Sequence, residues 1–165
     1  MKDLQTALDN VNMTYEELIS IAKDIVSRYS SDVDSLINDS ANKIEVLSND
    51  KIRLLITSLS FKAYSLSEAK EHSILKAEVA ETLLNEKKAI EFNGAEGTVD
   101  SRRNIATINS SEEILVNIIY DTVGSLLKSK LDEVHRIVET LKTVLMSRNT
   151  ELKINSDLRD ERVGM

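Results

Sequence analysis

The sequence predicts an all-α protein built on one long antiparallel helical hairpin, similar to a coiled coil, with shorter helices before it. Three observations predict this fold. The chain of 165 residues contains no proline and only four glycines, so little in it interrupts a long helix. Aromatic residues make up only 4% of the chain, which leaves an aliphatic core of the kind that narrow helix–helix contacts use. The third observation is a regular apolar seam near the C-terminus.

The seam residues follow alternating steps of four and three, the pattern that keeps one stripe of a helix against a partner helix. They are Leu127, Leu131, Val134, Val138, Leu141, Leu145 and Leu152. Arg148 occupies a seam position, where a charge can set register or oligomeric state. The seam predicts packing of helix against helix, either within one chain or between copies of it.

Residues 1–49 are predicted to form the shorter, acidic helices. Thr14 and Glu17 have the spacing of a capping box, in which a hydroxyl and a carboxylate satisfy free N–H groups at a helix start. A Ser-Ser-Asp tripeptide at residues 30–32 either interrupts the helix that follows or begins a second one. Ten acids and four bases in the first 50 residues place −6 of the net charge of −7 in this region.

Residues 50–155 are predicted to form the hairpin. Ser48-Asn49-Asp50 is a helix start signal, and Asn93-Gly94 is a stop signal because both residues tolerate a left-handed cap. One long helix is therefore expected from about residue 50 to about residue 92. Its apolar stripe contains Ile52, Leu55, Ile56, Leu59, Ala63 and Leu66, and continues with Ala77, Val79, Ala80, Leu83 and Leu84.

The second arm of the hairpin follows a loop at residues 94–98 and a short helical turn at residues 100–104. Ser110 and Glu113 repeat the capping-box spacing. The last long helix is therefore expected from about residue 111 to about residue 153. Residues 156–165 are polar and are predicted to fray.

No catalytic, cofactor or metal site is predicted, and no small-molecule substrate. Cysteine is absent, which excludes disulfides, thiolate ligands and a cysteine nucleophile. Gly94 and Gly97 flank a turn that lacks the Gly-Lys-Ser/Thr ending of a phosphate-binding loop. His72 and His135 lie on separate predicted helices, where a surface position explains each. We therefore expect a protein that is not an enzyme.

No apolar run approaches the roughly 20 residues that a membrane span needs. The N-terminal residues are polar and lack the apolar region of a signal peptide. We expect a cytoplasmic protein without a membrane partner.

Two groups of bases are candidates for phosphate contact. Lys87 and Lys88 end the first long helix, Arg102 and Arg103 follow the loop, and Phe92 lies between them as a stacking platform. The second group, on the last helix, contains Lys142, Arg148 and Lys153. The alternatives are lysines that complement a helix dipole and a solvated face paired with acids. Net acidity weakens nucleic-acid binding, because long-range repulsion opposes phosphate.

The Phe92-Asn93-Gly94 turn, and Ser147-Arg148 followed by Lys153, resemble the UvsY-type recombination mediators of tailed phages. That family carries a similar aromatic-Ser-Gly turn and a later Ser-Arg followed by Ile-Lys, and the resemblance covers roughly residues 65–155. This chain departs from it in the Asn of the turn and in its net acidity. The resemblance implies an oligomeric helical protein that binds single-stranded DNA and loads a recombinase, in the host cytoplasm if the protein is phage-encoded.

Three functions stay open. The first is a recombination mediator that binds single-stranded DNA on a homo-oligomer. The second is a structural or assembly protein whose helices bind partner helices without DNA. The third is an acidic inhibitor of a host DNA-binding protein, acting through the acidic N-terminal region.

Overall fold

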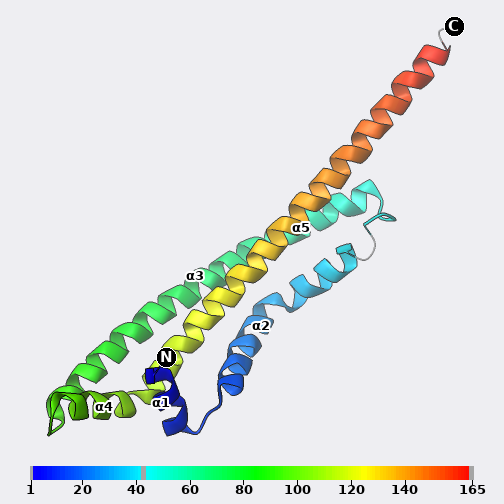
Figure 1. Cartoon of the computed structure of the whole chain (residues 1–165). Coiled ribbons are helices and arrows are strands. Elements are labelled where there is room, and N and C mark those ends of the chain that lie inside the picture. Colours follow the sequence, from blue (N-terminus) through cyan, green and yellow to red (C-terminus); the bar gives the residue numbers. More distant parts are fainter. Residues whose placement is uncertain (1, 42–43, 164–165) are drawn as a thin grey trace. The chain divides into compact units, whose positions relative to one another are not determined.

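The computed structural model describes the backbone at residues 2–41 and 44–163 and the side chains at residues 3–38 and 44–154. In this described part the chain forms five helices and no strand, which confirms the all-α class (Figure 1). The helices are α1 (Lys2–Val11), α2 (Tyr15–Ala41), α3 (Asn49–Gly94), α4 (Val99–Asn109) and α5 (Ser111–Val163). With 46 and 53 residues, α3 and α5 are the two long helices that the sequence predicts.

The helices group into two compact units. Unit 1 contains residues 1–30 and 66–129, and unit 2 contains residues 31–65 and 130–165. Unit 1 therefore holds α1, the start of α2, the later part of α3, α4 and the start of α5. Unit 2 holds the remaining parts of α2, α3 and α5.

Within unit 1, α3 and α5 form an antiparallel pair. The Ser73 hydroxyl donates to the Tyr120 carbonyl over 2.9 Å, whereas the Lys87 amine lies 2.7 Å from a Glu113 carboxylate oxygen. Residue numbers along α3 therefore increase in the direction in which those along α5 decrease. A cluster of core residues lies near Lys87 and joins α1 and α2 to the pair of α3 and α5. Its buried members are Ala7, Leu8, Leu18, Leu84, Ile114 and Leu115.

Within unit 2, α2 lies beside both long helices. Asp32 of α2 accepts from the Lys62 amine of α3 over 2.7 Å, and Asp34 accepts from Lys130 of α5 over the same distance. Because Arg148 of α5 contacts the connector that follows α2, α2 and α5 run in the same direction here. The buried side chains of this unit include Val33, Ile37, Ile52, Leu59, Val134, Val138 and Leu141.

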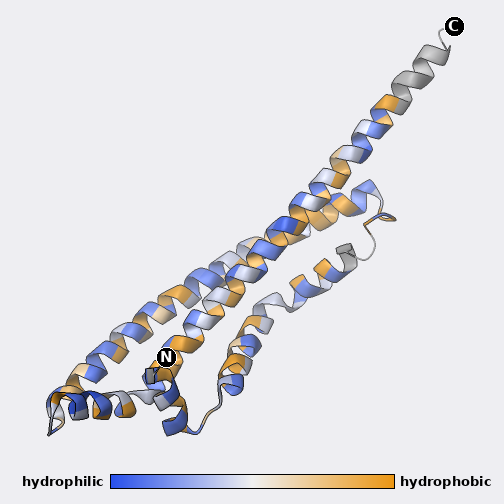
Figure 2. Ribbon diagram, in the orientation of Figure 1, coloured by the Kyte–Doolittle hydropathy of each residue, from blue (hydrophilic) through white to orange (hydrophobic). Residues whose placement is uncertain are grey.

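The predicted seam is covered within one chain over most of its length. Its first five members are at most 9% exposed, and they are Leu127, Leu131, Val134, Val138 and Leu141. Leu145 is half-buried, and Leu152 is 61% exposed. Apolar and polar residues alternate along both long helices, as Figure 2 shows. The buried part of the seam therefore serves intramolecular packing.

Two of the three predicted helix starts are confirmed by their caps. At Thr14, the backbone N–H donates to the Glu17 carboxylate over 2.7 Å and the hydroxyl accepts from the Glu17 N–H over 3.2 Å. This is a complete capping box. At Ser48, the hydroxyl accepts from the Lys51 N–H over 3.4 Å, and α3 begins at the next residue.

The predicted capping box at Ser110 does not form. The Ser110 N–H already donates to the Ala106 carbonyl over 3.1 Å, because α4 runs up to this residue. Glu113 therefore has no free N–H to accept from at Ser110, and its carboxylate binds Lys87 instead. The Ser110 hydroxyl is buried without a hydrogen-bond partner.

The helices are also longer than the sequence predicts. The tripeptide at residues 30–32 neither interrupts nor restarts α2, because Val26, Ser30 and Val33 are buried in succession along one face. The helical turn expected at residues 100–104 is the 11-residue α4, capped by the Thr98 hydroxyl. α5 continues to Val163, past the expected end, because neither proline nor glycine lies between Gly124 and Gly164 to stop it. Among the helices of the described part, none has a stretch apolar enough to span a bilayer.

Candidate nucleic-acid interface

A tight connector brings the end of α3 next to α4. The Ala95 N–H extends the helix by donating to the Glu91 carbonyl over 3.0 Å. Gly97 then adopts a φ of +111°, a conformation that side-chain-bearing residues rarely take. The Thr98 hydroxyl accepts from the Ser101 N–H over 3.3 Å and starts α4. The chain therefore reverses over four residues and places the bases of α4 beside Phe92.

The Arg102 guanidinium stacks on the Phe92 ring in a cation–π contact. The guanidinium carbon lies 4.2 Å from the centroid of the Phe92 ring. The Arg102 Nε also donates to the Phe92 carbonyl over 2.8 Å. These two contacts fix the guanidinium in place while its terminal nitrogens keep donors for other acceptors.

Lys88 and Arg103 lie on the same surface. With Phe92 they line a depression of about 510 Å³, together with Asp3, Ala89, Ala106 and Thr107. The Lys88 amine lies 3.2 Å from an Asp3 carboxylate oxygen, and Arg103 lies 4.0 Å from Asp100. The Arg103 side chain is 73% exposed, so its ion pair is weak. The structure thus brings together three of the four predicted bases of this group, Lys88, Arg102 and Arg103, beside Phe92. We call these four residues the α3–α4 end.

Lys87 has a different role. Its amine lies 2.7 Å from the Glu113 carboxylate, in a contact where both side chains are partly buried. The hydrogen bond to Glu113 raises the pKa of the Lys87 amine, and the nearby charges of Glu112 and Glu91 act in the same direction. Lys87 therefore joins α3 to α5 through an ion pair.

The second predicted group lies in unit 2 and is engaged mainly in contacts within the chain. The Lys142 amine lies 2.7 Å from Glu139, one helical turn away, and both side chains are exposed. The Arg148 guanidinium donates to the carbonyls of Ile44, Glu45 and Leu47. Lys153 is exposed on α5. Sequence reasoning missed the partners of Arg148 because they lie more than 100 positions earlier in the chain.

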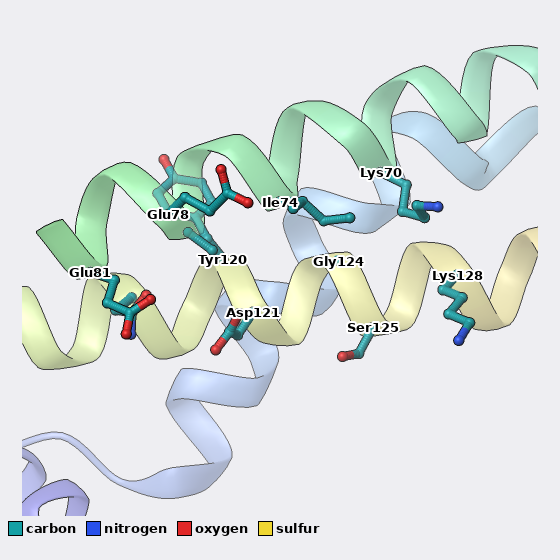
Figure 3. Close-up of a pocket in the computed structure, with 11 residues that line it drawn as sticks. Lys70, Ile74, Glu78, Glu81, Tyr120, Asp121, Gly124, Ser125 and Lys128 are labelled. Carbon is teal, nitrogen blue, oxygen red and sulfur yellow. The ribbon is translucent and has the colours of Figure 1, made fainter.

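Two further grooves lie between α3 and α5 in unit 1, and the first is polar. Its volume is about 580 Å³, and Gly124 forms part of its floor beside Ile74 (Figure 3). The charged residues that line it are of both signs: Lys70, Glu78, Glu81, Asp121 and Lys128. Among the described residues, no three histidine or acidic side chains come close enough to hold a metal ion.

The second groove is apolar, and we call it the apolar groove. It has a volume of about 460 Å³ and is lined mainly by Leu75, Val79, Ala80, Leu83, Val116 and Tyr120. The sequence assigns Val79 and Leu83 to the core stripe of α3, but the structure exposes them by 52% and 55%. The other members of that predicted stripe, Ala77, Ala80 and Leu84, are buried. A run of apolar residues on neighbouring faces cannot by itself show which face is covered.

Comparison of the chain with models of known protein families, with curated proteins and with solved structures found no match in any of the three.

Proposed function

We propose that this chain is a non-enzymatic accessory protein that binds single-stranded DNA at the α3–α4 end. The observation that carries the proposal is the stack of Arg102 on Phe92, beside the 73% exposed Arg103. Proteins that bind single strands combine aromatic platforms for bases with cations for phosphates. The α3–α4 end supplies both within one depression.

The surrounding acids decide how strong such binding can be. Asp3 and Asp100 pair with Lys88 and Arg103, and both carboxylates are largely exposed. Exposed ion pairs contribute about 0–1 kcal/mol, so a phosphate can displace these carboxylates at little cost. With few phosphate contacts and a net charge of −7, the affinity should be modest. It should fall with salt in proportion to the small number of phosphates that are contacted.

The recombinase-loading role rests on the resemblance to UvsY-type mediators. Of the positions that carry this resemblance, Phe92 lies at the α3–α4 end, whereas Arg148 binds backbone carbonyls within unit 2. We therefore assign the proposed DNA contact to Phe92, Arg102 and Arg103, and not to Arg148. A mediator of this kind should speed filament formation by its recombinase on single strands that carry single-strand-binding protein.

Fluorescence anisotropy with labelled oligo-dT tests the DNA contact at about 20 mM and about 150 mM salt. We expect binding at the lower salt, weakened about tenfold by Arg103→Glu and by Phe92→Leu, which keeps the bulk but loses the ring. Arg53→Glu is the matched control, because Arg53 is 60% exposed, pairs with Asp50 and lies in unit 2. No binding at low salt, or equal losses for Arg103→Glu and Arg53→Glu, would rule out the proposed interface.

A second candidate function is assembly through partner helices without DNA. The apolar groove favours it, because Leu75, Val79 and Leu83 are each more than half exposed in succession along α3. Contiguous exposed apolar surface of this kind typically marks an interaction site. Indifference to oligo-dT together with stable association would favour this function over the first.

A further inference from the structure

The apolar groove has chemically different ends. Lys76 lines the end near Leu75 and Tyr120, and its amine lies 5.3 Å from the centroid of the Tyr120 ring. Glu112 lines the groove and, because α3 and α5 are antiparallel, lies level with the Leu83 end. Glu113, its neighbour, is already paired with Lys87. The groove therefore has a basic end and an acidic end, with apolar side chains between them.

We propose that the apolar groove binds the same groove of a second copy of this chain, with the two α3 helices antiparallel. A twofold axis near Val79 and Leu83 reverses the direction of the second groove. Lys76 of each copy then faces Glu112 of the other, and the apolar residues between them meet. Contacts of this kind are isologous, so each pairing occurs twice.

The charges select the second copy as the occupant and set its direction. A parallel pair would place Lys76 against Lys76 and Glu112 against Glu112, and like charges in contact are unfavourable. A foreign helix would need apolar residues at the same helical spacing and charges in the opposite order. A second copy supplies both without further requirement. The buried part of the predicted seam is not accessible to a second copy, because it packs within the chain. This leaves the apolar groove as the surface for the contact.

The test is size-exclusion chromatography with light scattering on the full chain over a range of concentrations. We expect a dimer or a multiple of it for the wild type, and a monomer for Leu83→Glu. Lys76→Glu and Glu112→Lys should each weaken association about tenfold, since each variant places two like-charge pairs in the interface. An equimolar mixture of these two variants should associate as well as the wild type, because only the mixed dimer restores opposite charges at both contacts.

Glu78→Lys is the matched control, because Glu78 lines the polar groove on the other side of α3. It should leave association unchanged, and circular dichroism should show the same helix content for every variant. A monomeric wild type, or an oligomer that Leu83→Glu does not disrupt, would overturn the proposal. Weakened single variants that mixing does not rescue would overturn the antiparallel arrangement. Oligo-dT binding by Leu83→Glu tests the proposed function separately, since the α3–α4 end does not include Leu83.

Discussion

Arg148 occupies a position where the seam pattern otherwise places an apolar side chain. Its guanidinium lies 2.9 Å from the Ile44 carbonyl and 3.0 Å from that of Glu45, and it also donates to Leu47. A guanidinium carries five N–H donors in a fixed plane, so one side chain can satisfy several carbonyls of a short connector. The charge at this position therefore anchors the connector between α2 and α3 to α5.

We predict that Arg148→Leu lowers the free energy of unfolding by about 1.5–3 kcal/mol, the range for hydrogen bonds that involve a charged group. The loss should occur even though leucine fits the seam, because the carbonyls lose their donor. Urea denaturation followed by circular dichroism measures it. Arg53→Leu, which removes one exposed pair with Asp50, should change the value by less than about 0.5 kcal/mol. A more stable Arg148→Leu variant would show that seam packing outweighs the anchor.

Gly124 is buried on α5 against α3, but it is not required there. A Cβ at this position would lie 3.8 Å from Ile74 and from the Ser73 hydroxyl, which is ordinary van der Waals contact. Glycine inside a helix costs about 0.5–1 kcal/mol relative to alanine. We predict that Gly124→Ala raises the free energy of unfolding by that amount, measured as above. A loss of stability would mean that α3 and α5 approach more closely than this geometry allows.

The junction between α1 and α2 shows how local chemistry ends one helix and starts the next. Asn12 has a φ of +56°, the Met13 N–H donates to the Leu8 carbonyl over 3.0 Å, and the Asn12 N–H donates to Asp9 over 3.3 Å. These two bonds form a Schellman motif. The capping box at Thr14 follows directly. Three residues thus define both helix ends.

We predict that Asn12→Val lowers the free energy of unfolding by about 1–2 kcal/mol, because a β-branched residue is strained at positive φ. Asn12→Gly, the matched control, removes the same side chain but tolerates this conformation, and should be neutral or stabilising. Thermal melts of both variants give the comparison. Equal destabilisation of the two would instead assign the effect to the lost amide side chain.

Elements whose signals are local were predictable from the sequence, and those set by distant contacts were not. The capping box at Thr14 and the start at Ser48 depend on neighbours within one turn. The pairing at Ser110 failed because α4 already uses its N–H and because Lys87, 26 positions earlier, takes the Glu113 carboxylate.

The same limit applies to the candidate site. The sequence places Phe92 and the two arginines near one turn, and the structure brings them together. Neither the stack of Arg102 on the Phe92 ring nor the engagement of Lys88 by Asp3 follows from spacing. Asp3 lies 85 positions from Lys88. The apolar groove was missed because apolar residues occupy two adjacent faces of α3, and only packing decides which one is covered.

At the scale of the whole molecule, ion pairs between helices set the pH range of stability. In unit 1, burial favours the neutral acid at Glu113, but the Lys87 hydrogen bond and charge outweigh it and hold the pKa of Glu113 below its ordinary 4.5. In unit 2, burial disfavours the Lys130 ammonium, yet the hydrogen bonds that it donates to Asp34 and Glu133 outweigh this effect and raise the pKa of Lys130 above its ordinary 10.5. Each ion pair thus stabilises the fold when both of its members are charged.

We predict that stability is constant near neutral pH and falls on both sides. A carboxyl with a depressed pKa contributes above its unfolded pKa, so the Glu113 contribution is lost as the pH falls below about 4.5. An amine with a raised pKa contributes below its unfolded pKa, so the Lys130 contribution is lost as the pH rises above about 10.5. The urea concentration at the midpoint of unfolding, measured across this pH range, reports the loss of stability on the acid side and on the alkaline side.

Lys87→Met provides the control for the acid limb. Without Lys87 the pKa of Glu113 should rise, because burial is then opposed only by a backbone hydrogen bond. The variant should be less stable at neutral pH, and its stability should fall less steeply with acid than that of the wild type. An unchanged slope would show that other carboxylates account for the acid limb.

The short connectors, together with the absence of proline and cysteine, have a consequence for refolding. Slow phases of tens of seconds in other proteins usually reflect prolyl isomerisation or disulfide exchange, and this chain can undergo neither. Each helix is also joined to its sequence neighbour by only a few residues. Stopped-flow refolding should therefore be fast, and any slow component should accelerate with protein concentration, because it would report the encounter of two chains.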